Sequence, residues 1–140
     1  MFARSMIALQ YFFALGNKLF VRFMQFMLVG ESATREEVIE WIRSNESDLE
    51  QLDAVFLTDL DAKFSGVVPT GRLLLAESGQ TMSSLKSEPL LHLPPDANEK
   101  EVFELFDKYN LRVLSVVDET GVPIGAITVD DVVTRLAAKV

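Results

Sequence analysis

The chain has no cysteine and only one histidine among its 140 residues. The lack of cysteine excludes a disulfide framework and any metal site built on thiolates. Because His92 stands alone, sites and catalytic arrangements that need several imidazoles are excluded as well. A chain of this length is long enough for one domain with a substantial core. These absences fit an intracellular protein best, and we expect a cytoplasmic location.

Basic residues are also scarce. Lysine and arginine total 13 against 21 aspartates and glutamates, so the formal net charge is −8. A nucleic-acid backbone is bound by a concentrated cationic surface, which this composition does not supply, and we expect no nucleic-acid partner. The sequence lacks a glycine-rich P-loop, a nucleophile paired with a base, and a histidine-containing metal motif. We therefore expect that the protein is not an enzyme.

A long uncharged run is missing too, although residues 1–23 are rich in Phe, Leu and Met. The longest uncharged run there, between Arg4 and Lys18, has 13 residues, whereas a membrane-spanning helix needs about 20. Apolar residues recur at steps of three, four and seven, which predicts an apolar helix: Met6, Leu9, Phe13, Phe20, Met24 and Met27. A partner-facing helix and a helix packed on its own domain stay open as interpretations. A lipid-surface helix is less favoured because cations are few.

Two segments of similar design lie in the two halves of the chain. ESATREEVIEWIRSN and PPDANEKEVFELFDKYN share an Ala, a Glu and two apolar positions at the same spacing: Ala33, Glu37, Val38 and Ile42 against Ala97, Glu101, Val102 and Phe106. Their apolar residues fall on one helical face, so each segment predicts an amphipathic helix. Each helix starts with the spacing of a capping box, Thr34 with Glu37 and Asn98 with Glu101. The chain therefore contains an internal repeat.

A strand, a turn and a second strand are predicted after each of these helices. AVFLTDLDAKFSGVV and VLSVVDETGVPIGAI each contain an apolar run, an aspartate, a turn, and a glycine that opens another apolar run. Asp59 and Gly66 of the first copy correspond to Asp118 and Gly125 of the second, and the first copy has an insertion after its helix, in the stretch ESDLEQL. A further helix is predicted weakly by GRLLLAESG and clearly by DDVVTRLAAKV. Each copy therefore has the order strand, helix, strand, strand, helix.

This order, and the segment VLSVVDETGVPIGAITVDDVV in the second copy, resemble the cystathionine-β-synthase (CBS) domain pair, or Bateman module. The resemblance covers residues 24–140 and is most specific in Val113–Val133. In detail this segment is similar to the cytoplasmic CBS region of MgtE-type magnesium transporters. The resemblance implies two repeats in a pseudo-twofold arrangement, pairing of two modules as a homodimer, and binding of adenosine-type nucleotides in clefts between repeats.

The expected fold class is α/β, of the α+β kind, with two β-α-β-β-α CBS repeats preceded by the apolar N-terminal helix. We expect the following boundaries: an N-terminal apolar segment at 1–23, repeat 1 at 24–77, a linker at 78–88 and repeat 2 at 89–140. The linker is rich in the Ser, Gly and Pro that are typical of irregular chain.

The stretch IGAITVDDVV places Thr128 at the end of a strand and Asp131 in the first turn of a helix. One interpretation is a helix cap, in which the hydroxyl and the carboxylate satisfy the helix start. The family resemblance implies another, in which the Asp131 carboxylate accepts hydrogen bonds from both ribose hydroxyls while Thr128 contacts sugar or phosphate. Both interpretations stay open, and the two roles can coexist because a carboxylate has two oxygens.

The resemblance also implies that Arg112 contacts phosphate and that Val113 and Ile127 are apolar neighbours of the base. Core packing explains the two apolar residues equally well. Ser115 departs from the family pattern, which often has proline at this position.

The first repeat lacks the residues of this site. Pro69 and Arg72 stand where Thr128 and Asp131 stand in the second. A proline has no hydroxyl and an arginine cannot accept a hydrogen bond, so no ribose contact is predicted there. We interpret Arg72 as a solvated surface residue, with a phosphate or an acidic partner as the alternative.

Magnesium is the second candidate ligand. The resemblance implies that carboxylates at domain and subunit interfaces sense Mg²⁺, which prefers one or two carboxylates together with retained waters. Asp118, Glu119 and Asp130 are the candidates, although an acidic surface is more often simply solvated. Our leading hypothesis is a regulatory module that senses an adenine nucleotide (AMP, ADP or ATP), Mg²⁺ or both, for an MgtE-like transporter or similar protein. The alternative is a structural dimerisation module without a small ligand.

Overall fold

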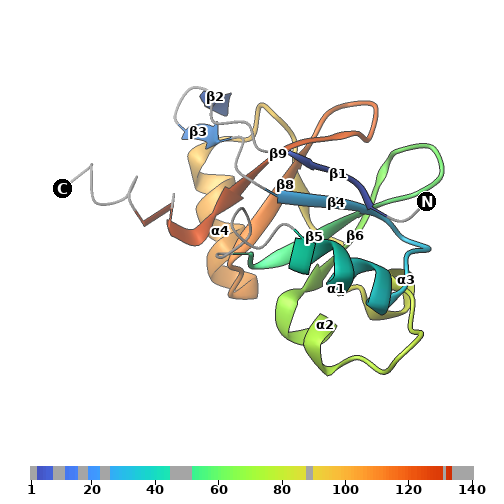
Figure 1. Ribbon diagram of the computed structural model, residues 1–140. Coiled ribbons are helices and arrows are strands. Elements are labelled where there is room, and N and C mark those ends of the chain that lie inside the picture. The colour runs from blue at the N-terminus through green and yellow to red at the C-terminus, as the bar shows by residue number, and fades with distance from the viewer. Residues whose placement is uncertain are drawn as a thin grey trace. The chain divides into compact units, whose positions relative to one another are not determined.

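The computed structural model describes these parts of the chain: residues 3–7, 12–15, 19–22, 26–44, 52–87, 90–130 and 132–133 (Figure 1). The chain divides into two compact units. The first comprises Met1–Leu9 and Gln25–Leu90, and the second comprises Gln10–Met24 and Leu91–Val140. Each unit is built around its own β-sheet.

In the first unit, the described residues form a sheet with the strand order β1-β4-β5-β6: β1 Ala3–Ile7, β4 Phe26–Gly30, β5 Ala54–Thr58 and β6 Phe64–Pro69. β4 and β5 are parallel, and the other neighbouring strands are antiparallel. The helices of this unit are α1 Arg35–Ser44, α2 Thr70–Leu75 and α3 Met82–Leu85. In the core, alternate strand residues pack against the inward sides of the three helices. Its buried members are Val29, Ala33, Val38, Val55, Leu57, Val68, Leu73, Met82 and Leu85.

In the second unit, the sheet order is β2-β3-β9-β8-β7: β2 Phe12–Leu15, β3 Leu19–Arg22, β9 Pro123–Thr128, β8 Val113–Val117 and β7 His92–Leu93. β7 and β8 are parallel, and the other pairs are antiparallel. Helix α4 spans Glu99–Tyr109, and residues 129–130 and 132–133 are also helical. The core of this unit has these buried members: Leu93, Ala97, Val102, Phe106, Leu114, Val116, Ile127 and Val132.

The two repeats have the same strand register, which confirms the internal repeat predicted from sequence. β5 and β6 match β8 and β9 in length, strand for strand. The cross-strand pair Ala54 and Pro69 corresponds to Val113 and Thr128. Both hairpins even carry an irregularity at the same place, after Leu57 in one and after Val116 in the other. Equal turn spacing thus produces equal pairing, because the turn determines the register of a hairpin.

The capping box predicted for α1 is present, and α4 has a related reciprocal cap between the two predicted residues. In α1 the Glu37 N–H donates to Thr34 Oγ1 at 3.3 Å, and the Thr34 N–H donates to Glu37 Oε1 at 3.0 Å. In α4 the Glu101 N–H donates to Asn98 Oδ1 and Asn98 Nδ2 donates to Glu101 Oε1, both at 2.9 Å. In each helix the N–H of the glutamate in the first turn is therefore capped by the residue that precedes the helix, which fits the helix starts predicted from sequence.

The predicted N-terminal helix is wrong in the described part of residues 1–23, which forms strands β1, β2 and β3 instead. β1 pairs with β4, and β3 pairs with β9 through Arg22 and Ala126. Short apolar runs rich in Phe, Val and Ile suit strands as well as helices, and their spacing alone does not separate the two. Pairing with strands far along the chain therefore decides the conformation.

The segment expected to be an irregular linker, residues 78–88, contains α3. Across the described residues, no helix is both long and apolar enough to cross a membrane.

Candidate functional site

The structure brings together three of the residues predicted to bind nucleotide, at the point where β9 ends and a helix begins. Thr128 is the last residue of β9 and is paired with Val113, the first residue of β8. The backbone N–H of Val129 donates to the carbonyl oxygen of Arg112 at 2.8 Å. The start of β8 is thereby held against the start of the helix. This junction of Arg112, Val113 and Thr128 follows directly from the β8–β9 hairpin.

Alternation along the strands separates the predicted residues between two faces of the sheet. Thr128 is buried, Val113 is half-buried and the Arg112 side chain is exposed. Ile127 points the other way, because successive strand residues face opposite sides, and it is a fully buried member of the core. The structure therefore places Ile127 with the core residues rather than beside Thr128.

Asp131 lies outside the described residues, so its proposed contact with ribose stays a prediction. The helical residues 129–130 and 132–133 flank it in the chain. Val132 is buried in the core, whereas Val133 is 57% exposed. The predicted change from strand to helix after Thr128 is therefore confirmed.

Asp118 organises the turn between β8 and β9. Its Oδ1 accepts hydrogen bonds from the Thr120 N–H at 2.9 Å, from the Thr120 hydroxyl at 2.6 Å and from the Val122 N–H at 3.0 Å. Asp59 does the same in the first repeat, where Oδ1 accepts from the N–H groups of Asp61 and Lys63. The aspartate that recurs in both copies of the sequence repeat thus has a structural role in each of them.

The predicted magnesium ligands are not gathered into a metal cluster. Asp118 uses one carboxylate oxygen in the turn, while Glu119 and Asp130 have exposed side chains. Over the parts of the chain that the structure describes, no group of three or more acidic or histidine side chains is arranged to hold a metal ion. Any Mg²⁺ contact by these residues stays a prediction.

The corresponding junction of the first repeat has a different chemistry. Pro69 precedes α2 and makes no side-chain hydrogen bond to the helix start. Arg72, in α2, donates from Nη1 to the carbonyl oxygen of Leu85 at 3.2 Å. The first repeat therefore has a proline and an arginine donor at this junction, where the second repeat has the hydroxyl of Thr128.

Known proteins that are similar to this chain identify its family. The CBS domain family model matches residues 82–138. The magnesium transporter MgtE of Thermus thermophilus is 30% identical over 115 residues, which are 82% of this chain and 26% of the transporter. The crystal structure of the cytosolic domain of the Mg²⁺ channel MgtE in complex with ATP has a TM-score of 0.72 at 29% identity, covering 78% of this chain and 44% of that one. The chain is a CBS domain pair.

A further solved relative supports the fold of this CBS pair. A CBS domain pair/ACT domain protein from Thermotoga maritima has a TM-score of 0.66 at 26% identity, and the match covers 82% of this chain and 91% of that one. The CBS pair spans only about a quarter of the MgtE sequence from Thermus thermophilus, namely 26%.

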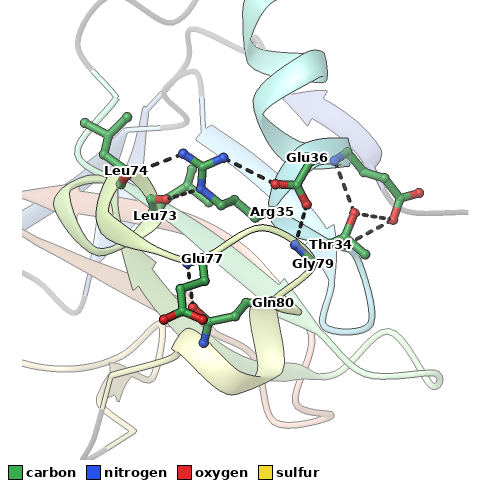
Figure 2. Close-up of polar contacts among 9 residues, drawn as sticks. Thr34, Arg35, Glu36, Leu73, Leu74, Glu77, Gly79 and Gln80 are labelled. Atoms are coloured by element: carbon green, nitrogen blue, oxygen red, sulfur yellow. Dashed lines mark hydrogen bonds and ion pairs between the residues drawn. The ribbon is translucent and has the colours of Figure 1, made fainter.

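The CBS pair also contains polar contacts that the sequence did not predict, between the start of α1 and both the end of α2 and the segment after it (Figure 2). Arg35 Nε donates to the carbonyl oxygen of Leu73 at 3.2 Å, and Nη2 donates to that of Leu74 at 3.4 Å. The N–H of Gly79 donates to Glu36 Oε1 at 2.7 Å. These partners are far apart in the chain, so periodicity and spacing carry no signal of them. Arg35 thus supplements the C-terminal cap of α2, where the Leu73 carbonyl also accepts from the Ala76 N–H at 3.4 Å.

The same contacts change the acidity of two glutamates. The hydrogen bond from the Gly79 backbone N–H holds the pKa of Glu36 below its usual value, and the Thr34 backbone N–H does the same to the pKa of Glu37. Hydrogen bonds to a carboxylate favour its charged form. Both carboxylates are therefore more acidic in the folded chain.

Acid is expected to remove part of the stability that Glu36 contributes. A carboxylate whose pKa is lowered on folding stabilises the folded chain above its unfolded pKa, and that contribution is lost as the pH falls through the folded pKa. Glu36→Gln keeps an acceptor for Gly79 but cannot titrate. We expect the wild type to have a higher free energy of unfolding in urea than this variant at about pH 6, and we expect this difference to shrink as the pH is lowered to about 3. Glu40→Gln, on the exposed side of α1, controls for the loss of one charge. A pH-independent difference would contradict the assignment.

Proposed function

We propose that this CBS pair is the regulatory module of a magnesium or other divalent-cation transporter, or of a similar protein, and that its second repeat binds an adenine nucleotide. The observation that carries the proposal is the junction of Arg112, Val113 and Thr128 at the start of the last helix. The relationship to MgtE, whose cytosolic domain was solved with ATP, supports both the ligand and the parent protein. The module then belongs to a cytoplasmic region, and the transporter domain lies elsewhere in the parent chain.

Each residue of the proposed site has a distinct chemical task. Asp131 accepts hydrogen bonds from the ribose hydroxyls, and the Thr128 hydroxyl contacts sugar or phosphate. Arg112 provides a permanent cation for phosphate, and its exposed position avoids the cost of burying a charge. Val113 supplies apolar surface for the base. Ile127 supports the strand from the opposite face of the sheet.

Regulation follows if nucleotide changes the packing of repeats or of paired modules. A ligand shifts the equilibrium between two packing arrangements only to the extent that it binds one of them more tightly than the other. Mg²⁺ is proposed as a second signal through Asp118, Glu119 and Asp130, held by one or two carboxylates with water as the remaining ligands. We propose no catalytic step for this module.

Thr128→Val is expected to weaken nucleotide binding about tenfold, because the variant keeps the β-branched shape and loses the hydroxyl. Isothermal titration calorimetry of the whole chain with AMP, ADP and ATP, each with and without Mg²⁺, measures the effect. Asp131→Asn should weaken binding further by removing the charge.

Thr58→Val is the matched control. Thr58 is a buried threonine at the end of β5 whose hydroxyl has no hydrogen-bond partner among the residues that the structure describes. This change should leave nucleotide affinity as it is. The proposal fails if no adenine nucleotide binds at millimolar concentration, or if Thr128→Val and Asp131→Asn both bind like the wild type.

The second candidate function is a dimerisation module without a small ligand. It is favoured by the exposed leucines of α2, since Leu74 is 63% and Leu75 is 88% exposed. Large apolar side chains exposed side by side are typical of contact surfaces. Sedimentation velocity on the calorimetry samples separates the two functions. A homodimer that binds no nucleotide supports the second, whereas a nucleotide-dependent change in association supports the first.

A further inference from the structure

The first repeat has an open pocket on its surface, called the cavity below, beside Pro69 and Arg72, which replace the proposed ribose-binding residues of the second repeat. The cavity has a volume of about 410 Å³ and lies between α2 and the segment that leads into α3. Apolar and polar residues share its lining: Pro69, Leu75, Ala76 and Leu85 with Arg72 and Gln80. Small-molecule sites commonly have volumes of about 300 to 1,000 Å³ and combine apolar walls with a few polar groups. The cavity is therefore large enough for a compact organic molecule.

Arg72, an exposed residue of α2, is the charged group of this cavity, and a backbone carbonyl orients it. Its Nη1 donates to the Leu85 carbonyl at 3.2 Å, which holds the guanidinium between α2 and α3. Among the described residues, no carboxylate pairs with Arg72, although the chain carries a net charge of −8. A guanidinium has five N–H donors, so one bond to a carbonyl leaves donors for an anion. Gln80 is already engaged, since its Oε1 accepts from the Glu77 N–H at 2.8 Å.

The apolar part of the cavity defines the rest of the ligand. Leu75 is 88% exposed at its rim, while Leu85 is buried. A ligand body seated between them would remove the Leu75 side chain from water, which favours binding. From these contacts we infer that repeat 1 binds a small molecule in which a carboxylate or phosphate group is attached to a compact apolar body. Arg72 pairs with the anion, and the α2–α3 cavity holds the body.

This site shares no residue with the proposed nucleotide site, because every residue that lines it belongs to the first unit. It also explains how two repeats with the same strand register serve different ligands. The second repeat is proposed to accept hydrogen bonds from sugar hydroxyls, whereas the first repeat donates to an anion.

Titration of the ¹⁵N-labelled chain, followed by amide NMR shifts, tests the inference. The probes are phenyl phosphate and benzoate, which combine an anion with an apolar ring. Inorganic phosphate provides the anion alone, and benzyl alcohol provides the ring alone. We expect saturable shifts at Gly71, Ala76 and Gln80 with a dissociation constant on the order of millimolar for at least one combined probe, and binding about tenfold weaker for both partial probes. Binding of phenyl phosphate alone identifies a phosphate ligand, and binding of benzoate alone identifies a carboxylate.

Arg72→Gln should weaken binding of the combined probe about tenfold, because it keeps a polar side chain and removes the charge. Arg43→Gln is the control, since Arg43 is an exposed arginine near the end of α1 and does not line the cavity. Leu75→Ala, a second variant at an exposed position, should weaken binding about threefold through loss of apolar contact. The inference is overturned if no probe saturates, if Arg72→Gln binds like the wild type, or if the shifts lie at residues 112–130. The last outcome would instead indicate the proposed nucleotide site.

Discussion

Replacement of Met82 by alanine is expected to lower the free energy of unfolding of the first unit by about 3 kcal/mol. Met82 lies in a segment that composition identifies as a linker, but its side chain is fully buried in the core of that unit. The backbone is held as well, because the Met82 N–H donates to the Ala33 carbonyl and the Ser83 N–H donates to the Glu31 carbonyl, both at 2.8 Å. Loss of the side chain therefore leaves a cavity that the fixed backbone cannot close. Urea unfolding measures the change.

Leu60→Ala is the matched control for this prediction. Leu60 is a large apolar residue of the same unit and is 99% exposed, so its truncation should change stability by less than about 0.5 kcal/mol. If Met82→Ala costs no more than the control, residues 81–83 do not belong to the core of the first unit. If both variants lower the free energy of unfolding by several kcal/mol, the burial of the side chain does not determine the loss of stability. The difference in stability between the two variants thus tests whether this part of the expected linker belongs to the folded core of the first unit.

The repeats were predictable from sequence because their signals are local. A capping box, an aspartate at a turn and a glycine shortly after that turn each act over a short stretch of chain, and both copies carry all three. The N-terminal strands were not predictable, because their conformation depends on pairing with β4 and β9. The contacts of Arg35 with the end of α2 were missed for the same reason. Local chemistry therefore predicts the elements, and long-range pairing decides the ambiguous segments.

The candidate site was predictable in part. Val113 and Thr128 are opposite each other because the turn fixes the hairpin register. The separation of Ile127 from Thr128 also follows from sequence, since adjacent residues of a strand face opposite sides of the sheet. The cavity beside Arg72 was not predictable, because it depends on α3, which lies in the segment expected to be irregular.

Asp118→Ala is expected to destabilise the second unit by about 2 kcal/mol, and Asp59→Ala to destabilise the first by about 1 kcal/mol. The two aspartates occupy the same turn position, but Asp118 Oδ1 also accepts from the Thr120 hydroxyl at 2.6 Å. Removal of the carboxylate leaves the N–H groups of Thr120 and Val122 without this acceptor. Urea unfolding of the two variants, with Glu119→Ala as the exposed neighbouring control, measures the difference.

Asp118→Asn distinguishes the structural role of this residue from a role in binding Mg²⁺. An amide oxygen accepts the same hydrogen bonds without the charge, so this variant should keep at least half of the stability that Asp118→Ala loses. A Mg²⁺ ligand needs the charge, because hard cations prefer carboxylate oxygens. If Asp118 binds Mg²⁺, Asp118→Asn abolishes the Mg²⁺-dependent rise in melting temperature while preserving the turn. If that rise persists in the variant, Glu119 and Asp130 remain as candidates and Asp118 serves the turn alone. A wild-type chain whose melting temperature does not respond to Mg²⁺ would remove all three from the proposed cation site.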